Sequence, residues 1–308
     1  MTVDPILALQ TFGYTEREAS FLYLVAVHSG YFLRRQFDYF IDRNKGAIAQ
    51  NFLEKARIAG HIEVIDYGEA RHVYHLFSKP IYRLLGNAES QNRRRKGDGL
   101  IRARLIALDY VLEYDSDHYL ESDRDKADFF GRVRSIPPEF FSDRDGKLFA
   151  TLTSFTVSLV DRMQPATSLV RFLFADEALL STAKFARFLS VLERLLRALR
   201  TFEIVYTSNS SHNFVDAEEQ FRARFALAAP AKQRTLRVEW KDDSLTKNAI
   251  EPAPLHAQFT TLLLHFNYPR IRRNESPSLA MVHPSGLQKG EKLAAIATDK
   301  REGGSYVG

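Results

Sequence analysis

Residues 15–77 carry the pattern that most restricts how this chain can fold, because three helical segments are followed directly by two short alternating segments. Thr15 and Glu18 form a Thr-x-x-Glu capping box, which predicts the start of the first helix. Apolar side chains at helical spacing predict a second helix over residues 33–41 and a third over residues 45–59. Each helix has one apolar face, so the three are expected to pack against one another.

Two alternating segments follow the third helix. Residues 61–65 and 71–77 alternate in period two, and Gly68 lies in the turn between them, which predicts a β-hairpin. Three helices followed by a hairpin is the element order of a winged helix-turn-helix. We therefore assign residues 1–86 to that fold.

The third helix of such a fold packs one face on the other helices and leaves the opposite face free to enter a major groove. Asn and Gln side chains on that face can pair with base edges, and Lys and Arg can meet phosphates. The same fold also serves in protein docking, and its basic residues are then only a solvated surface. The residues expected to contact DNA are Arg34, Arg35, Arg43, Asn44, Lys45, Gln50, Asn51, Arg71, His72, Arg93, Arg94 and Arg95.

The distribution of charge favours a nucleic-acid surface in the N-terminal part. The chain has 308 residues and a net charge of +5. Its first 99 residues hold 14 basic and 11 acidic side chains, whereas the longer remainder has a net charge of only +2. The basic excess per residue is therefore about threefold larger in the N-terminal part.

The composition also restricts the cellular compartment in which this protein is expected. The chain has no cysteine, which excludes disulfides and thiolate metal sites and fits a reducing compartment. The first ten residues lack the basic start and apolar run of a signal peptide, and the longest apolar stretches are too short to cross a bilayer. We expect a cytoplasmic protein that makes no membrane contact.

Three runs, at residues 15–41, 47–66 and 72–86, resemble the N-terminal domain of the replication-relaxation family. The matching features are a T-x-R-E start, a glycine between the third helix and the first wing strand, and a Y-x-L strand that leads into a short helix. Members of that family are encoded on bacterial plasmids and integrated mobile elements. The resemblance covers residues 12–86, and it implies a role in replication, mobilisation or transcription control of such an element.

The rest of the chain divides by composition into three parts. Residues 87–99 are polar, contain four consecutive basic side chains and end in Gly-Asp-Gly, which is typical of a basic linker. Residues 100–268 mix helical and strand patterns and are expected to form an α/β domain. Residues 269–308 hold several prolines and glycines with little periodicity, and we expect a loosely ordered tail there.

A long helix between two strand patterns in the second part predicts a βαβ unit with parallel strands. The expected class is thus α+β or α/β. In the resembled family the segment after the winged helix is similar in layout to a restriction-endonuclease-like fold, here catalytically degenerate. The expected elements are helices at residues 100–114, 179–199, 216–225 and 255–267, with strands within 148–159 and at 168–174, 202–207 and 236–240.

The resembled layout implies an Mg²⁺ site made of carboxylates and a lysine. This chain offers Glu139, Asp176 and Glu177, but the nearest lysine is Lys184, inside the long helix. A pair of acids this far apart is common by chance, and Asp176 can instead cap that helix. We therefore assign no catalytic residue and no cofactor. Mg²⁺ is expected as a cofactor only if the chain is a nuclease.

The other acidic residues and the histidines also lack the spacing of a metal site. Residues 115–128 are acidic but lack the spacing of a calcium loop, and Ser122 there predicts a capped helix. The nine histidines form no pair with metal-ligand spacing; His72 and His75, three apart on a strand, point to opposite faces. No metal site is predicted.

These observations favour a DNA-binding protein. The winged helix reads double-stranded DNA, and the α/β domain serves dimerisation or contact with a protein partner. We expect a homodimer, because paired half-sites add specificity to a small interface. Two alternatives stay open: an Mg²⁺-dependent nuclease that uses Glu139, Asp176 and Glu177, and a protein-interaction scaffold that does not bind DNA.

Overall fold

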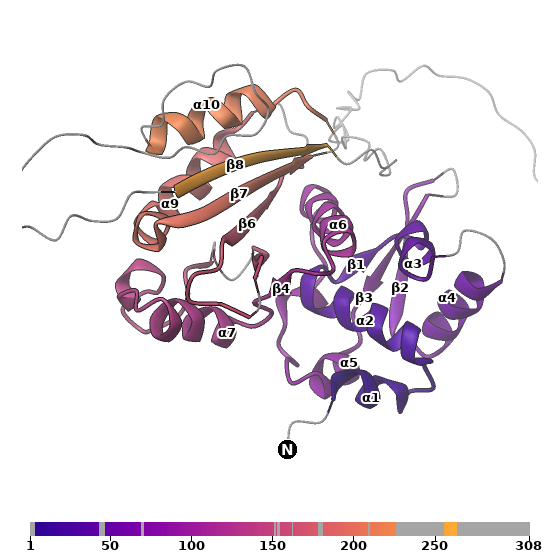
Figure 1. Cartoon of the computed structure of the whole chain (residues 1–308). Coiled ribbons are helices and arrows are strands. Elements are labelled where there is room, and N and C mark those ends of the chain that lie inside the picture. Colours follow the sequence, from indigo (N-terminus) through magenta and orange to yellow (C-terminus); the bar gives the residue numbers. More distant parts are fainter. Residues whose placement is uncertain are drawn as a thin grey trace, which may run out of the picture. The chain divides into compact units, whose positions relative to one another are not determined.

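The computed structural model describes residues 4–42, 47–68, 71–150, 152, 155–161, 163–177, 181–208, 210–225 and 256–263. Contacts between residues group the chain into two units, residues 1–271 and residues 272–308, and every described residue lies in the first. That first unit contains helices and two β-sheets, so the expected α+β class is confirmed (Figure 1). The predicted tail at residues 269–308 lies outside the described residues.

The N-terminal elements surround a three-stranded antiparallel sheet of order β1-β3-β2 (Figure 1). The predicted capping box is confirmed: Thr15 Oγ1 accepts from Glu18 N, and Glu18 Oε2 accepts from Thr15 N at 2.8 Å. The predicted second helix and both hairpin strands are also confirmed. The elements are α1 (Pro5–Gln10), α2 (Glu16–His28), β1 (Tyr31–Phe32), α3 (Arg34–Phe40), α4 (Ile48–Ile58), β2 (Ile62–Asp66), β3 (His72–Leu76) and α5 (Lys79–Leu84).

Aromatic side chains hold α2, α3 and α4 together. Phe37 of α3 stacks on Phe52 of α4 with ring centroids 4.2 Å apart, and Phe21 of α2 meets Phe37 edge-on at 5.0 Å. All three side chains are fully buried. The burial of Phe52, with that of Ala49, Leu53 and Ala56, fixes which face of α4 points inward and which points outward.

The segment predicted as a linker packs against α2. Residues Gln91–Arg93 form a short 3₁₀ helix, and Asn92, which is buried, donates from Nδ2 to the carbonyls of Ala26 and Val27. Gly30, with φ +79°, lets the backbone approach closely: a Cβ there would lie 2.2 Å from the Asn92 carbonyl oxygen. Residues 87–94 are thus fixed to the N-terminal elements.

The second sheet has five strands in the order β4-β5-β6-β7-β8. The pairs β6–β7 and β7–β8 are parallel, and the predicted βαβ unit is confirmed by α9, which connects β6 to β7. The elements of this part are α6 (Asp98–Glu113), β4 (His118–Tyr119), α7 (Asp123–Asp128), a π-helical turn (Phe129–Val133), a 3₁₀ helix (Pro138–Phe140), β5 (Val157–Leu159), β6 (Val170–Ala175), α9 (Ala183–Leu199), β7 (Thr201–Ser208), α10 (Phe214–Phe225) and β8 (His256–Leu263).

Helices cover both faces of this sheet. Phe172 and Ile204 belong to the large core that includes α9 and α10, whereas the alternate residues Leu173 and Val205 pack with Ala107 and Tyr110 of α6. The opposite side of α6 joins the N-terminal cores. The helix α6 is therefore shared by both sheets (Figure 1).

One prediction about strands and helices is wrong, a second is confirmed in part, and a third is not tested. The helix expected at residues 255–267 is the strand β8, which pairs with β7 over eight positions, from Thr201↔His256 to Ser208↔Leu263. Sequence spacing suggested a helix, but the free edge of β7 supplies a partner that an isolated segment lacks. The strand expected within residues 148–159 is confirmed in part, because Val157–Leu159 forms β5 among the residues described there. The strand expected at residues 236–240 lies outside the described residues.

Within the part of the chain that the structure describes, no helix combines the length and apolar character needed to cross a bilayer.

The buried His28 predicts an acid-dependent loss of stability. Its Nε2 has no hydrogen-bond partner among the described residues, and burial, with repulsion from Lys126 and Arg104, lowers its pKa to about 3. The unfolded chain binds this proton below about pH 6.5, where the folded chain does not, so stability falls as the pH falls from 6.5 towards 3. We expect His28 to account for a loss of about 2 kcal/mol between pH 7 and pH 5.

Urea unfolding at both pH values tests this prediction. The His28→Leu variant should lose about 2 kcal/mol less than the wild type on acidification. The exposed His72→Gln variant is the matched control and should keep the wild-type dependence. Equal acid sensitivity of His28→Leu and the wild type would contradict the assignment.

Candidate nucleic-acid interface

The outward face of α4 is polar in its first turns. Gln50 and Asn51 are exposed, and neither side chain has a hydrogen bond to another described residue. Two apolar side chains, Ile48 and Ile58, are also exposed on this short helix, Ile58 to 74%. This face therefore offers amide groups and apolar contacts to a partner.

The cations on and beside α4 are mostly engaged by carboxylates. Arg57 pairs with Glu54 at 2.7 Å on the same helix, and Lys55 reaches Glu18 of α2 at 2.5 Å. Arg34 of α3, half exposed, lies 3.6 Å from Asp38. The Arg57 and Arg34 pairs are at the surface and weak enough for a phosphate to displace the carboxylate, whereas Glu18 is buried and holds Lys55 more firmly.

Arg35 has a structural position in this fold. Its Nη1 and Nη2 donate to Asp109 Oδ1 and Oδ2, both at 2.8 Å, and the neighbouring Gln36 Nε2 donates to Asp109 Oδ1 at 2.8 Å. The Asp109 side chain is only 2% exposed, whereas that of Arg35 is 30% exposed. The guanidinium thus joins α3 to α6, and we no longer count it among the residues available to DNA.

The hairpin end carries the other residues expected at the interface. Arg71 and His72 are exposed where the turn enters β3, and His72 Nδ1 lies 3.6 Å from Asp66 Oδ1. His75 is buried and bonded to Glu63, so the two histidines do point to opposite faces, as predicted. Arg43, Asn44 and Lys45 lie outside the described residues.

The basic run after the 3₁₀ helix lies beside this hairpin. Arg95 reaches to 4.0 Å from Glu63 of β2, and Tyr31 of β1 bonds the backbone of the run through the Arg94 carbonyl and the Lys96 N–H. The side chains of Arg94 and Arg95 are exposed, and Arg93 is half-buried. The run is therefore held by its backbone while two of its guanidinium groups face solvent.

The three carboxylates of the nuclease alternative have separate environments. Glu139 is exposed in a 3₁₀ helix, Glu177 pairs with Lys184 at 2.7 Å, and Asp176 is buried and accepts from Asn213 Nδ2 at 3.2 Å. The predicted capping role of Asp176 is wrong, because the helix begins at Ala183 with Thr182 as its N-cap. Among the described residues, no group of three or more His, Asp or Glu side chains could hold a metal ion.

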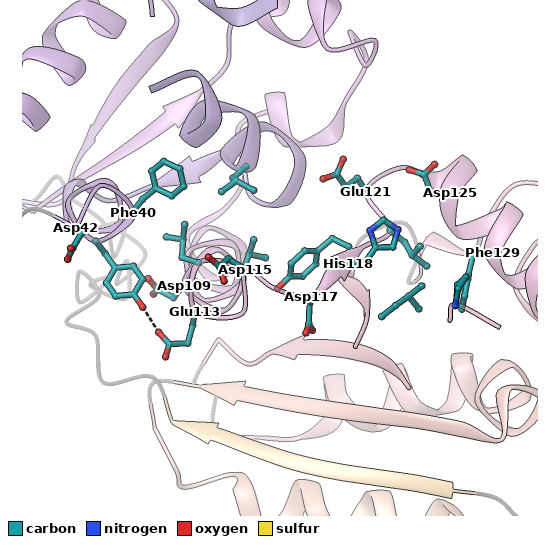
Figure 2. A pocket seen from close by; sticks show the side chains of 18 of the residues that line it. Phe40, Asp42, Asp109, Glu113, Asp115, Asp117, His118, Glu121, Asp125 and Phe129 are labelled. Carbon is teal, nitrogen blue, oxygen red and sulfur yellow. Dashed lines mark hydrogen bonds between the residues drawn. The ribbon is translucent and has the colours of Figure 1, made fainter. Parts of the chain in front are cut away.

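A large acidic cavity of about 1310 Å³ lies beside α3, α6 and α7 (Figure 2). Tyr39 of α3 donates to Glu113 of α6 at its edge, and His118 lies near Glu121 and Asp125 in the same view (Figure 2). Nine carboxylates line it: Asp38, Asp42, Asp109, Glu113, Asp115, Asp117, Glu121, Asp125 and Asp128.

Most of these carboxylates already have partners. Tyr23 donates to Glu121, whose pKa is raised by burial and further by the charge of Asp125. Asp117 accepts from Arg171, and the Asp125 carboxylate accepts from the backbone N–H and hydroxyl of Ser122, the residue that caps α7, as predicted. The concentration of negative charge makes this cavity unfavourable for phosphate groups.

In comparisons with known proteins, no protein-family model, no curated protein and no solved structure matches this chain. The resemblance to the replication-relaxation family and the restriction-endonuclease-like layout both stay predictions.

Sequence reasoning missed the ion pair between α3 and α6 and the acidic cavity. Asp109 offered one signal, since it is a single carboxylate between Leu108 and Tyr110 in an apolar stretch. A carboxylate on the buried side of a helix needs a partner, and a cation was therefore to be expected opposite it. Which cation that is depends on the fold, because Arg35 lies 74 positions away in the chain.

Proposed function

We propose that this protein binds double-stranded DNA through a winged helix-turn-helix formed by α2 to β3, with α4 as the helix that enters the major groove. The observation that carries the proposal is the element order. The chain runs helix, short strand, helix, helix and hairpin, and the short strand pairs with the hairpin in the order β1-β3-β2. This order supports the proposal, because it is the order expected of a winged helix.

The chemistry of the exposed residues supports the same proposal. Gln50 and Asn51 can each donate and accept toward one base edge, which is how amide side chains read adenine. Arg94 and Arg95 supply exposed positive charge beside the hairpin and can meet phosphates. The acidic cavity would repel phosphate, so the charge pattern of the described residues favours one approach over others.

The wider role follows from the resemblance and is proposed with it. We propose a homodimeric, cytoplasmic regulator of a bacterial mobile element, whose second sheet with its helices serves dimerisation or partner contact. Paired half-sites would then give the specificity that one small interface lacks.

Selection from a random duplex pool, followed by fluorescence anisotropy across a salt series, tests the proposal. The Gln50→Ala/Asn51→Ala variant should bind the selected site about 10- to 100-fold more weakly and bind random duplex almost as the wild type does. The Arg94→Ala/Arg95→Ala variant should bind both the selected site and random duplex more weakly. It should also reduce the slope of log affinity against log salt concentration by about 2.

The Arg132→Ala variant is the control for loss of one charge, since Arg132 is 79% exposed on the π-helical turn after α7. It should bind as the wild type does. Absence of binding to any duplex, or binding that is equal at about 50 and 200 mM salt, would overturn the proposal.

A further inference from the structure

A second cavity, of about 450 Å³, lies between α6, the carboxyl end of β6 and the first turns of α9. Ligand sites of α/β folds commonly lie at the carboxyl ends of parallel strands, and β6 is parallel to β7. The volume falls within the range of about 300–1,000 Å³ that is usual for small-molecule sites. Most of the lining is apolar, and four cations converge on it: Lys96, Arg104, Lys184 and Arg187.

Arg104, which is partly buried, has few protein partners. Its single hydrogen bond among the described residues is a long one, from Nη1 to the His28 carbonyl at 3.4 Å, and it forms no ion pair there. Burial lowers the pKa of Arg104, because nearby groups offset little of the cost of burying its charge. Lys126, buried in an adjoining cavity that Arg104 also lines, adds a further positive charge.

The remaining charges do not compensate Arg104. Glu177 is the carboxylate among the described residues that line the cavity, and it is already paired with Lys184 at 2.7 Å. The Lys96 and Arg187 side chains have no ion pair with a described residue. Arg104 and Lys96, which are partly buried, and the exposed Arg187 thus face one cavity without a matching carboxylate, which makes the cavity electrostatically favourable for an anion.

The apolar wall of the cavity is aromatic. Phe155 stacks on Phe174 with ring centroids 5.7 Å apart and meets Phe188 at 4.7 Å. Phe155 is half-buried, whereas the other two rings are buried. The exposed part of the Phe155 ring offers a surface on which a flat apolar group can stack.

We propose that this cavity binds a small phosphorylated compound with a flat ring, of the nucleoside monophosphate class. The phosphate pairs with Arg104, Lys96 and Arg187, and the ring contacts Phe155. Phosphate is favoured over a carboxylate because its oxygens can satisfy several cations at once, and the guanidinium fork of arginine fits it. The proposal does not depend on DNA binding.

Isothermal titration of the full chain with AMP, adenosine and inorganic phosphate tests the site. AMP should bind, and adenosine and phosphate should each bind at least about tenfold more weakly, because each keeps only half of the contacts. The Arg104→Met variant should bind AMP at least about tenfold more weakly with an unchanged or higher Tm, since it removes a charge that has no carboxylate partner.

Further variants separate this site from the others. Lys96→Met and Arg187→Met change more exposed positions, and each should lower the affinity for AMP about three- to tenfold. These two variants also test the site if Arg104→Met does not fold. Arg132→Met and Gln50→Ala/Asn51→Ala should leave AMP binding unchanged. Failure of the wild type to bind AMP at millimolar concentration, or loss of Tm in Arg104→Met without loss of affinity, would overturn the proposal.

Discussion

Replacing Arg171 with methionine should lower the free energy of unfolding by about 3–5 kcal/mol, because it leaves two buried carboxylates without their cation. Arg171 Nε donates to Glu203 at 2.7 Å, and its Nη1 donates to both oxygens of Asp117 at 3.0 and 3.1 Å. The side chains of Asp117 and Glu203 are only 5% and 9% exposed.

The arginine is the centre of a polar row that crosses the second sheet. Ser158 of β5 donates to Asp117, and Thr260 of β8 donates to Glu203 at 2.5 Å. The row therefore ties β5 to β8 through side chains. Each carboxylate keeps a hydroxyl partner after the substitution, but a neutral donor offsets only part of the cost of a buried charge.

Denaturant unfolding of three variants measures the effect. Arg171→Lys should cost less than Arg171→Met, because an ammonium keeps the charge but cannot reproduce the fork that spans Asp117 and Glu203. Arg132→Met, which breaks an exposed pair with Asp128, should change stability by less than about 1 kcal/mol. A loss below about 1 kcal/mol in Arg171→Met would contradict the prediction that the two buried carboxylates depend on this cation.

Local sequence signals predicted the elements whose ends are determined locally. The capping boxes at Thr15 and Ser122 mark the starts of α2 and α7, because those hydrogen bonds join residues three positions apart. The hairpin was predictable for the same reason. The strand β8 was not, since its state depends on pairing with β7, about fifty positions earlier in the chain.

The candidate interface was predicted only in part. Exposure of Gln50 and Asn51 follows from the apolar spacing of α4, which the sequence displays. The role of Arg35 does not, because its sequence neighbours are the same whether it faces DNA or a carboxylate. The cavity with Arg104 also depends on α6 lying against the second sheet, which no local pattern encodes.

Substitutions of the adjacent Arg34 and Arg35 distinguish the proposed contact with DNA from a role in stabilising the fold. Arg35→Met should lower the free energy of unfolding by about 3 kcal/mol, because Asp109 then stays buried without its cation. Arg34→Met should cost less than about 1 kcal/mol, since its contact with Asp38 is exposed and long. The two substitutions remove the same charge from adjacent positions of α3.

The double variant Arg35→Met/Asp109→Leu isolates the pair itself. With both charges removed, the loss should be smaller than the sum of the single losses by at least about 1 kcal/mol, because the buried carboxylate that Arg35 no longer neutralises is gone as well. Additive losses in a thermodynamic cycle would show that the contact is not coupled. The proposed DNA binding can be measured on the same proteins: if Arg35→Met weakens it and the double variant restores it, Arg35 acts by joining α3 to α6 and not by meeting a phosphate.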